Sequence, residues 1–299
     1  MLLMISMTYA SAYGRLHGCH FFLLLHYTMT PKPLILLDAG HGINTAGKRS
    51  PFTHRQLQQL VEQYPHMFPS SDLQSLDISS LASADDASAS CLLEWQLNRD
   101  IALRTQQLLL ALDFDARLLV PEVADVSLAE RVHRAQALCA DHEQRGGIWP
   151  NRLLVSIHSN ASGCSRPRQL TPEVFTAPSG WECHVSGRSY GAAQLAGALY
   201  REAFHRLPVM FPVRSRRGVV PRDTPDDSLP DLSTLPWESD LYILRHAPCQ
   251  AVLTENLFMD CPKDCLWLLT DEGRDTLAQI HAAAIERRLR CAPSPSDRG

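Results

Sequence analysis

The chain has 299 residues, of which 45% are hydrophobic and 20% are charged, and its formal net charge at pH 7 is -4. This apolar fraction is ordinary for a folded core, so the composition excludes global disorder. A nucleic-acid-binding protein normally carries a basic excess, and the slightly acidic balance of this chain argues against that class.

The two ends of the chain differ from the rest. Residues 1–30 hold two short apolar clusters that lack the basic start and unbroken apolar run of a secretory signal, and neither is long enough to span a bilayer. We expect this stretch to be a leader or an over-extended start, with Met29 as a plausible true beginning; a degenerate export signal is the alternative. Residues 292–299 are expected to form a flexible tail, which leaves 31–291 as one folded domain.

The apolar runs and their spacing predict alternating strands and helices. In chain order we expect a strand at Leu34–Leu37, a helix at Leu92–Leu112, a strand at Arg117–Val120, a helix at Ser127–Cys139, strands at Leu153–Ile157 and Trp181–Val185, a helix at Ser189–Arg206, strands at Leu241–Leu244 and Ala251–Leu253, and a helix at Asp271–Arg290. This order predicts a single α/β domain with a mostly parallel central sheet flanked by helices on both faces.

Two polar stretches interrupt this pattern. Residues 53–90 read as a long excursion with some helix, and residues 222–240 as an acidic exposed loop. The nine cysteines are scattered, and none forms a CxxC pair, so we interpret them as free thiols; the Cys261–Cys265 run is typical of a helix start.

Three predicted strands run into residues that can bind a metal or move a proton: His41, His158 and Glu255. In open α/β sheets, ligands bind outside the carboxyl ends of the strands. A fourth candidate, Glu94, lies in the first turn of a predicted helix at the edge of its buried stripe. A buried carboxylate without a partner is costly, and a metal ion would satisfy it.

Two histidines and one carboxylate form a known catalytic zinc set, in which bound water has a pKa of about 7. Asp38 would orient the His41 imidazole, and Glu255 would act as general base. Each residue also has a plainer interpretation. Strand-end histidines are often only hydrogen-bonded, a glutamate at a helix start favours the helix dipole, and residues 254–256 would fit a solvated turn.

Three segments resemble motifs of the zinc-dependent N-acetylmuramoyl-L-alanine amidases of the type 3 family. They are LLDAGHG at residues 36–42, SIHSNA at 156–161 and TENLFM at 254–259. Further matches to this family are Arg217–Val219, Leu244–Arg245, the CPKD run at 261–264 and the Glu-x-x-x-Asn-Arg motif of Glu94, Asn98 and Arg99. Residues 44–51 resemble the corresponding segment of amidases from the Bacteroides group or its phages. The resemblance covers roughly residues 34–290.

The resemblance implies one zinc ion held by His41, Glu94 and His158, with Glu255 as the catalytic acid/base. Glu94 is the least secure of these, and Glu182 is the fallback ligand. Asn160 and Arg217 are the substrate-binding candidates that the resemblance suggests. Thr254 and Asn256 depart from the more usual Val-Glu-Thr/Asn-Gly pattern. The basic cluster of Arg214, Arg216, Arg217 and Arg222 would pair with stem-peptide carboxylates or form a solvated loop.

The implied substrate is the amide between N-acetylmuramic acid and L-alanine in peptidoglycan, and residues 31–291 would be the catalytic domain. Residues 53–90 and 222–240 are candidates for covering the crevice. The alternatives are another zinc peptidase acting on stem peptides and a catalytically silent peptidoglycan-binding domain. We expect the protein to act in the periplasm or at the cell wall, after export or, if it is phage-derived, after release by lysis. We expect no membrane span and no nucleic-acid partner, and a protein activator is an open alternative.

Overall fold

The computed structural model describes residues 31–63, 91–162, 178–186, 190–220 and 231–290. The two ends for which a leader and a tail are expected, 1–30 and 292–299, therefore lie outside the described residues. So do most of the 53–90 excursion and the first part of the 222–240 loop.

A central sheet carries the fold. Its strands have the order β4-β1-β5-β10-β6-β7-β8, and β9 pairs with β6. Their bounds are β1 Leu34–Ala39, β4 Asp115–Leu118, β5 Arg152–Asn160, β6 Trp181–Val185, β7 Val213–Ser215, β8 Gly218–Val220, β9 Trp237–Glu238 and β10 Gln250–Phe258. Strands β4, β1, β5 and β10 run parallel, whereas β6 is antiparallel to β10. This confirms the α/β prediction of a mostly parallel sheet.

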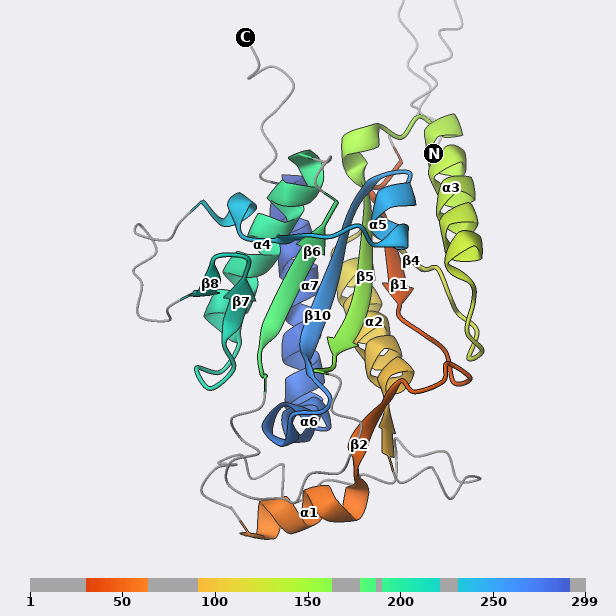
Figure 1. Cartoon of the computed structure of the whole chain (residues 1–299). Coiled ribbons are helices and arrows are strands. Elements are labelled where there is room, and N and C mark those ends of the chain that lie inside the picture. The colour runs from red at the N-terminus through yellow and green to blue at the C-terminus, as the bar shows by residue number, and fades with distance from the viewer. Residues whose placement is uncertain (1–30, 64–90, 163–177, 187–189, 221–230, 291–299) are drawn as a thin grey trace, which may run out of the picture. The chain divides into compact units, whose positions relative to one another are not determined.

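Helices cover both faces of the sheet (Figure 1). Their bounds are α1 His54–Gln63, α2 Glu94–Ala111, α3 Leu128–Gln144, α4 Tyr190–Arg206, α5 Tyr242–His246, α6 Pro262–Leu268 and α7 Asp271–Arg290. Helices α2, α4 and α7 pack on one face, and α3 and α5 pack on the other. None of the helices in the described part of the chain is long and apolar enough to cross a bilayer.

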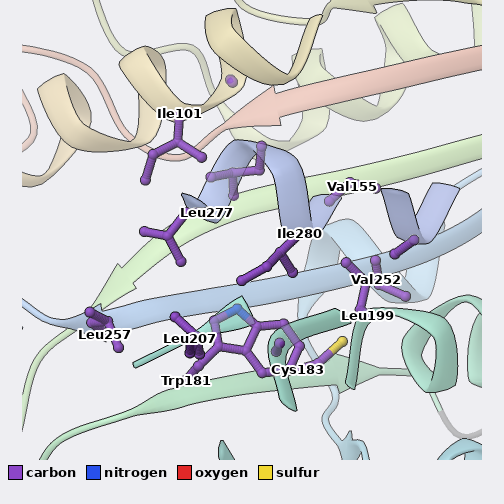
Figure 2. Close-up of a cluster of buried hydrophobic side chains, with 14 of the residues drawn as sticks. Ile101, Val155, Trp181, Cys183, Leu199, Leu207, Val252, Leu257, Leu277 and Ile280 are labelled. Atoms are coloured by element: carbon purple, nitrogen blue, oxygen red, sulfur yellow. The ribbon is translucent and has the colours of Figure 1, made fainter. Parts of the chain in front are cut away.

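The continuous apolar run of β1 is explained by its burial on both faces. Ile35 and Leu37 join the larger core under α2, α4 and α7, and Leu34 and Leu36 join the smaller core under α3 and α5. Successive strand residues point to opposite faces, so a strand covered on both sides needs no polar alternation. Figure 2 shows part of the larger core, in which Ile280 of α7 lies close to the strands.

One predicted strand is wrong. Residues Leu241–Leu244 begin a short helix, α5, in which the amides of Leu244 and Arg245 bond the carbonyl of Leu241. Ile243 and Leu244 enter the smaller core, so the run is apolar because it packs under α3. Short apolar runs do not distinguish a strand from a buried helical turn.

A small two-stranded sheet, which the sequence pattern did not indicate, leads into α2. Strands β2 (Arg49–Thr53) and β3 (Cys91–Leu93) are antiparallel, with Arg49 opposite Leu93. The amide of Glu94 then donates to the carbonyl of Lys48 at 3.0 Å. The loop after β1 is thereby tied to the first turn of α2.

The prediction that the cysteines are free thiols is confirmed for five of them. Cys139, Cys183, Cys249, Cys261 and Cys265 are buried and form no disulfide.

Candidate metal centre

Three polar side chains form a row across neighbouring strands. Glu255 of β10 is in register with His158 of β5 on one side and with Glu182 of β6 on the other. Residues opposite one another in a sheet point to the same face, so the three side chains share one face at the carboxyl ends of β5 and β10. Leu154 of β5 and Leu253 of β10 point to the same face as His158 and Glu255, and both belong to the smaller core. The three polar side chains therefore lie on the face of the sheet that carries the smaller core.

The loop after β1 brings His41 against His158. The two imidazole rings are nearly perpendicular, at 89°, with their centroids 5.0 Å apart. A Cβ atom on Gly40 would lie 2.2 Å from Cε1 of His158, so only glycine allows this approach. His41 itself has a φ of 66°, in the left-handed region that non-glycine residues adopt uncommonly, often at functional sites.

Glu94 completes a group that fits a metal site. Its Oε1 lies 3.3 Å from Nε2 of His41 and 3.3 Å from Nδ1 of His158. One ligand atom from each of the three residues lies within 4.8 Å of the others. Within the described residues, no other group of three or more His, Cys, Asp and Glu side chains brings its ligand atoms this close together. The structure thus brings together the three predicted ligands from three distant stretches of chain.

The electrostatics of this group favour an ionised carboxylate. Burial alone would raise the pKa of Glu94, but hydrogen bonds and charge interactions with His158 and His41 lower it well below its ordinary value. Burial likewise opposes a charge on His158, yet the hydrogen bond to Glu94 and the nearby acids raise its pKa overall. The pocket therefore attracts positive charge.

Polar neighbours fix the Glu94 carboxylate in place. The Asn98 amide donates to Oε1 at 3.3 Å and to the carbonyl of Gly40 at 3.1 Å. The Ser159 hydroxyl donates to the Asn98 side-chain oxygen at 3.1 Å. The second oxygen of Glu94, Oε2, is buried and accepts no hydrogen bond from the described residues, and the Lys48 ammonium lies 3.6 Å from it.

Glu255 has the properties of a proton carrier. Burial raises its pKa to about 7, and the charges of Glu94 and Glu182 add to the shift against the opposing influence of His158 and His184. Its Oε2 is buried and without a hydrogen-bond partner among the described residues. A carboxyl group with a pKa near the working pH is suited to both accepting and donating a proton.

The residue that orients the His41 loop is Arg131, which sequence reasoning missed. Asp38 accepts hydrogen bonds from Arg131 and Ser156, both at 2.6 Å, rather than bonding an imidazole as we had expected. Arg131 also donates to the carbonyls of Ala39 and His41, at 2.7 and 3.1 Å. The helical spacing could have predicted the burial of Arg131, because it lies four residues before Ala135 on the buried face of α3.

We expect Arg131→Met to lower the free energy of unfolding by about 3–5 kcal/mol, because it leaves the buried Asp38 carboxylate unpaired. Chemical denaturation of the purified protein measures this change. The control is Arg117→Met, which breaks a pair with Asp115 at a side chain that is 41% exposed and should cost about 1 kcal/mol or less. Equal losses for the two variants would contradict the assigned role.

The other predicted site residues have different surroundings. The Asn160 amide donates to Glu182 at 3.3 Å, and Arg214 pairs with the same carboxylate at 2.8 Å. Glu182, the fallback ligand, is thus engaged elsewhere and lies outside the metal-binding group. Arg217 is exposed in the turn between β7 and β8. In the basic cluster, Arg216 pairs with Glu238 at 2.7 Å, and Arg222 lies outside the described residues.

Comparison with known protein families decides the class. A family model described as N-acetylmuramoyl-L-alanine amidase matches residues 35–287. The chain belongs to this family. It is therefore a hydrolase that acts on peptidoglycan, and the resemblance drawn from its motifs is confirmed; the match does not distinguish a Bacteroides-like subgroup.

Solved structures share the fold at low identity. An N-acetylmuramoyl-L-alanine amidase from Clostridium difficile 630 is 18% identical with a TM-score of 0.54, and the match covers 88% of this chain and 100% of that one. The catalytic domain of CwlV from Bacillus (Paenibacillus) polymyxa is 18% identical with a TM-score of 0.51, covering 87% and 99%. Cwp6 from Clostridium difficile is 17% identical with a TM-score of 0.54; the match covers 86% of this amidase but only 29% of Cwp6. The comparison with curated proteins found no match.

Proposed function

We propose that His41, Glu94 and His158 hold one zinc ion and that Glu255 is the acid/base for hydrolysis of the amide between N-acetylmuramic acid and L-alanine. The observation that carries this proposal is the meeting of both imidazoles at one carboxylate oxygen, each 3.3 Å away. Asp38 and Arg131 support the site by holding the loop that carries His41.

The donor set fits zinc in its chemistry and in the distances from the carboxylate to the two imidazoles. In a tetrahedral site with bonds of about 2.0–2.2 Å, two ligand atoms lie about 3.3–3.6 Å apart. The separations from Glu94 to the two imidazoles have this length. The buried Oε2 atom of Glu94 accepts no hydrogen bond from the described residues and faces the Lys48 ammonium at 3.6 Å, which keeps the carboxylate ionised for a metal ion at Oε1.

A zinc ion held there would supply Lewis-acid polarisation of the amide carbonyl and make water nucleophilic near neutral pH. The protein's own contribution to proton transfer is Glu255, beside His158 in the strand register. As a carboxylate it would take a proton from the attacking water, and as a carboxylic acid it would return that proton to the departing alanine nitrogen. Its raised pKa makes both states accessible near neutral pH.

Arg214 is the part of the basic cluster that we infer to face the substrate. Its guanidinium lies 5.3 Å from the Phe258 ring centroid and is held by Glu182, the residue opposite Glu255 in the sheet. An arginine held in this way is suited to binding a stem-peptide carboxylate. Asn160 shares the Glu182 partner and is the second candidate, while Arg217 stays a prediction. Action takes place at the cell wall, and we leave periplasmic export and release by lysis as alternatives.

Digestion of purified sacculi followed by mass spectrometry tests the reaction. We expect stem peptides with free L-alanine amino termini and intact glycan strands, produced by the zinc-loaded enzyme. Cleavage within the stem peptide would instead indicate a zinc peptidase, and binding without products would indicate a silent domain. Either result would overturn the proposal.

A further inference from the structure

A buried chain of hydrogen bonds runs from the core to the backbone of a proposed zinc ligand. The His281 imidazole of α7 lies 2.9 Å from the Thr254 hydroxyl, and that hydroxyl accepts from the Asn256 amide at 3.1 Å. The same Asn256 amide donates to the carbonyl of His158 at 3.0 Å. The side chains of Thr254, Asn256 and His281 are fully buried.

The direction of every hydrogen bond in this series follows from two facts about His281: its bond to Leu277 and its neutral state. Nδ1 of His281 lies 2.6 Å from the Leu277 carbonyl, which can only accept, so Nδ1 carries the proton. Nε2 must then accept from the Thr254 hydroxyl, which leaves the hydroxyl oxygen to accept from Asn256. Burial lowers the pKa of His281 to about 4, which keeps the imidazole in this neutral form. Both amide hydrogens of Asn256 are thus used, and its oxygen accepts from the Trp181 indole at 3.1 Å.

This series of hydrogen bonds borders a strained part of β10. The register with β5 shifts between Glu255 and Phe258, and Leu257 has a φ of 67° although it is large and fully buried. A bulky residue in this region is strained and persists only where its surroundings fix it. Asn256 holds the backbone on one side of Leu257, and Asp264 accepts from the Phe258 amide at 3.0 Å on the other.

Polar partners on both sides of Leu257 supply the restraint that its strained backbone requires. Glycine would adopt the positive φ of this position without strain, whereas leucine does not. Valine in place of Thr254 would offer no hydroxyl to Asn256 or His281.

We propose that His281, Thr254 and Asn256 are positioning residues, which hold the β5–β10 register so that His158 and Glu255 face the metal site together. This inference rests on the proposed function. It requires that loss of the Thr254 hydroxyl weakens zinc binding, because Asn256 then loses one of its three hydrogen bonds and holds the carbonyl of His158 less firmly. Residues that orient metal ligands typically contribute about 10–100-fold to metal affinity.

The test compares Thr254→Val with Thr254→Ser in the full-length protein. The first variant keeps the shape and loses the hydroxyl, and the second keeps the hydroxyl. Zinc affinity is measured by competition with a chromophoric chelator, alongside the thermal midpoint of the metal-free protein. We expect Thr254→Val to bind zinc about 10-fold more weakly and Thr254→Ser to stay within about two-fold of the parent protein. Val132→Ala, in the smaller core, is the control for a purely structural loss and should leave zinc affinity unchanged.

A second variant covers the case in which Thr254→Val does not fold. His281→Phe removes the acceptor and keeps a ring, and we expect a similar loss of zinc affinity. Parent-like zinc binding by Thr254→Val, or by His281→Phe where only that variant folds, would overturn the inference while leaving the proposed function intact. A parent protein that neither binds zinc nor releases stem peptides would refute the proposed function instead.

Discussion

Replacing Glu255 with glutamine is expected to lower the turnover of sacculi by about 10²–10⁴-fold while one zinc ion per chain stays bound. Glutamine matches the shape of glutamate but cannot accept a proton from water or return it to the leaving nitrogen. The residue lies beside the metal-binding group without belonging to it, so its loss should not release the metal. The measurements are the rate of release of stem peptides and the zinc content of the purified protein.

The matched control for this experiment is Glu182→Gln. Glu182 is directly opposite Glu255 in the sheet and has the same chemistry, but its carboxylate is paired with Arg214 and bonded by Asn160. It is therefore not free to carry a proton, and we expect its variant to keep turnover within about ten-fold of the parent enzyme. A loss as large as that of Glu255→Gln would mean that Glu182 is also required for turnover, through its own proton transfer or through its hold on Arg214.

Zinc binding is expected to stabilise the folded protein strongly, and this stabilisation should require Glu94 as a ligand. A ligand that binds only the folded state at about 1,000 times its dissociation constant adds about 4 kcal/mol to the free energy of unfolding. For a domain of this size that corresponds to a rise of about 8–16 °C in the melting temperature. We expect this rise in the parent protein, its reversal by a chelator, and its absence in Glu94→Ala. Thermal denaturation at fixed free zinc provides the measurement.

The control here distinguishes the assigned ligand from its fallback. Glu182→Ala removes the carboxylate that the sequence left as an alternative, and it should retain the full zinc-induced rise because Glu182 lies outside the metal-binding group. If Glu182→Ala lost the rise and Glu94→Ala kept it, the ligand set would have to be redrawn. Zinc content, measured on both variants, separates loss of binding from a general loss of stability.

The fold class was readable from the sequence because the strongest strands are buried on both faces. The run at Leu34–Leu37 is apolar at every position, and the structure places alternate residues in two cores. The run at Leu241–Leu244 looked similar and was predicted wrongly, because burial on one side of a helical turn gives the same short pattern. The β2–β3 pair escaped prediction because its strands are short and far apart in sequence.

The candidate site residues could also be predicted from the sequence, since His41, His158 and Glu255 follow apolar runs that indicate strands entering one edge of a parallel sheet. Tertiary structure alone decided that Glu94, not Glu182, joins the two imidazoles, and that Asp38 acts through Arg131, which bonds the His41 loop. It also decided that His281, with no motif around it, reaches Thr254. The physical reason is that local sequence fixes burial and periodicity, whereas the partner of a buried polar atom depends on which distant element packs against it.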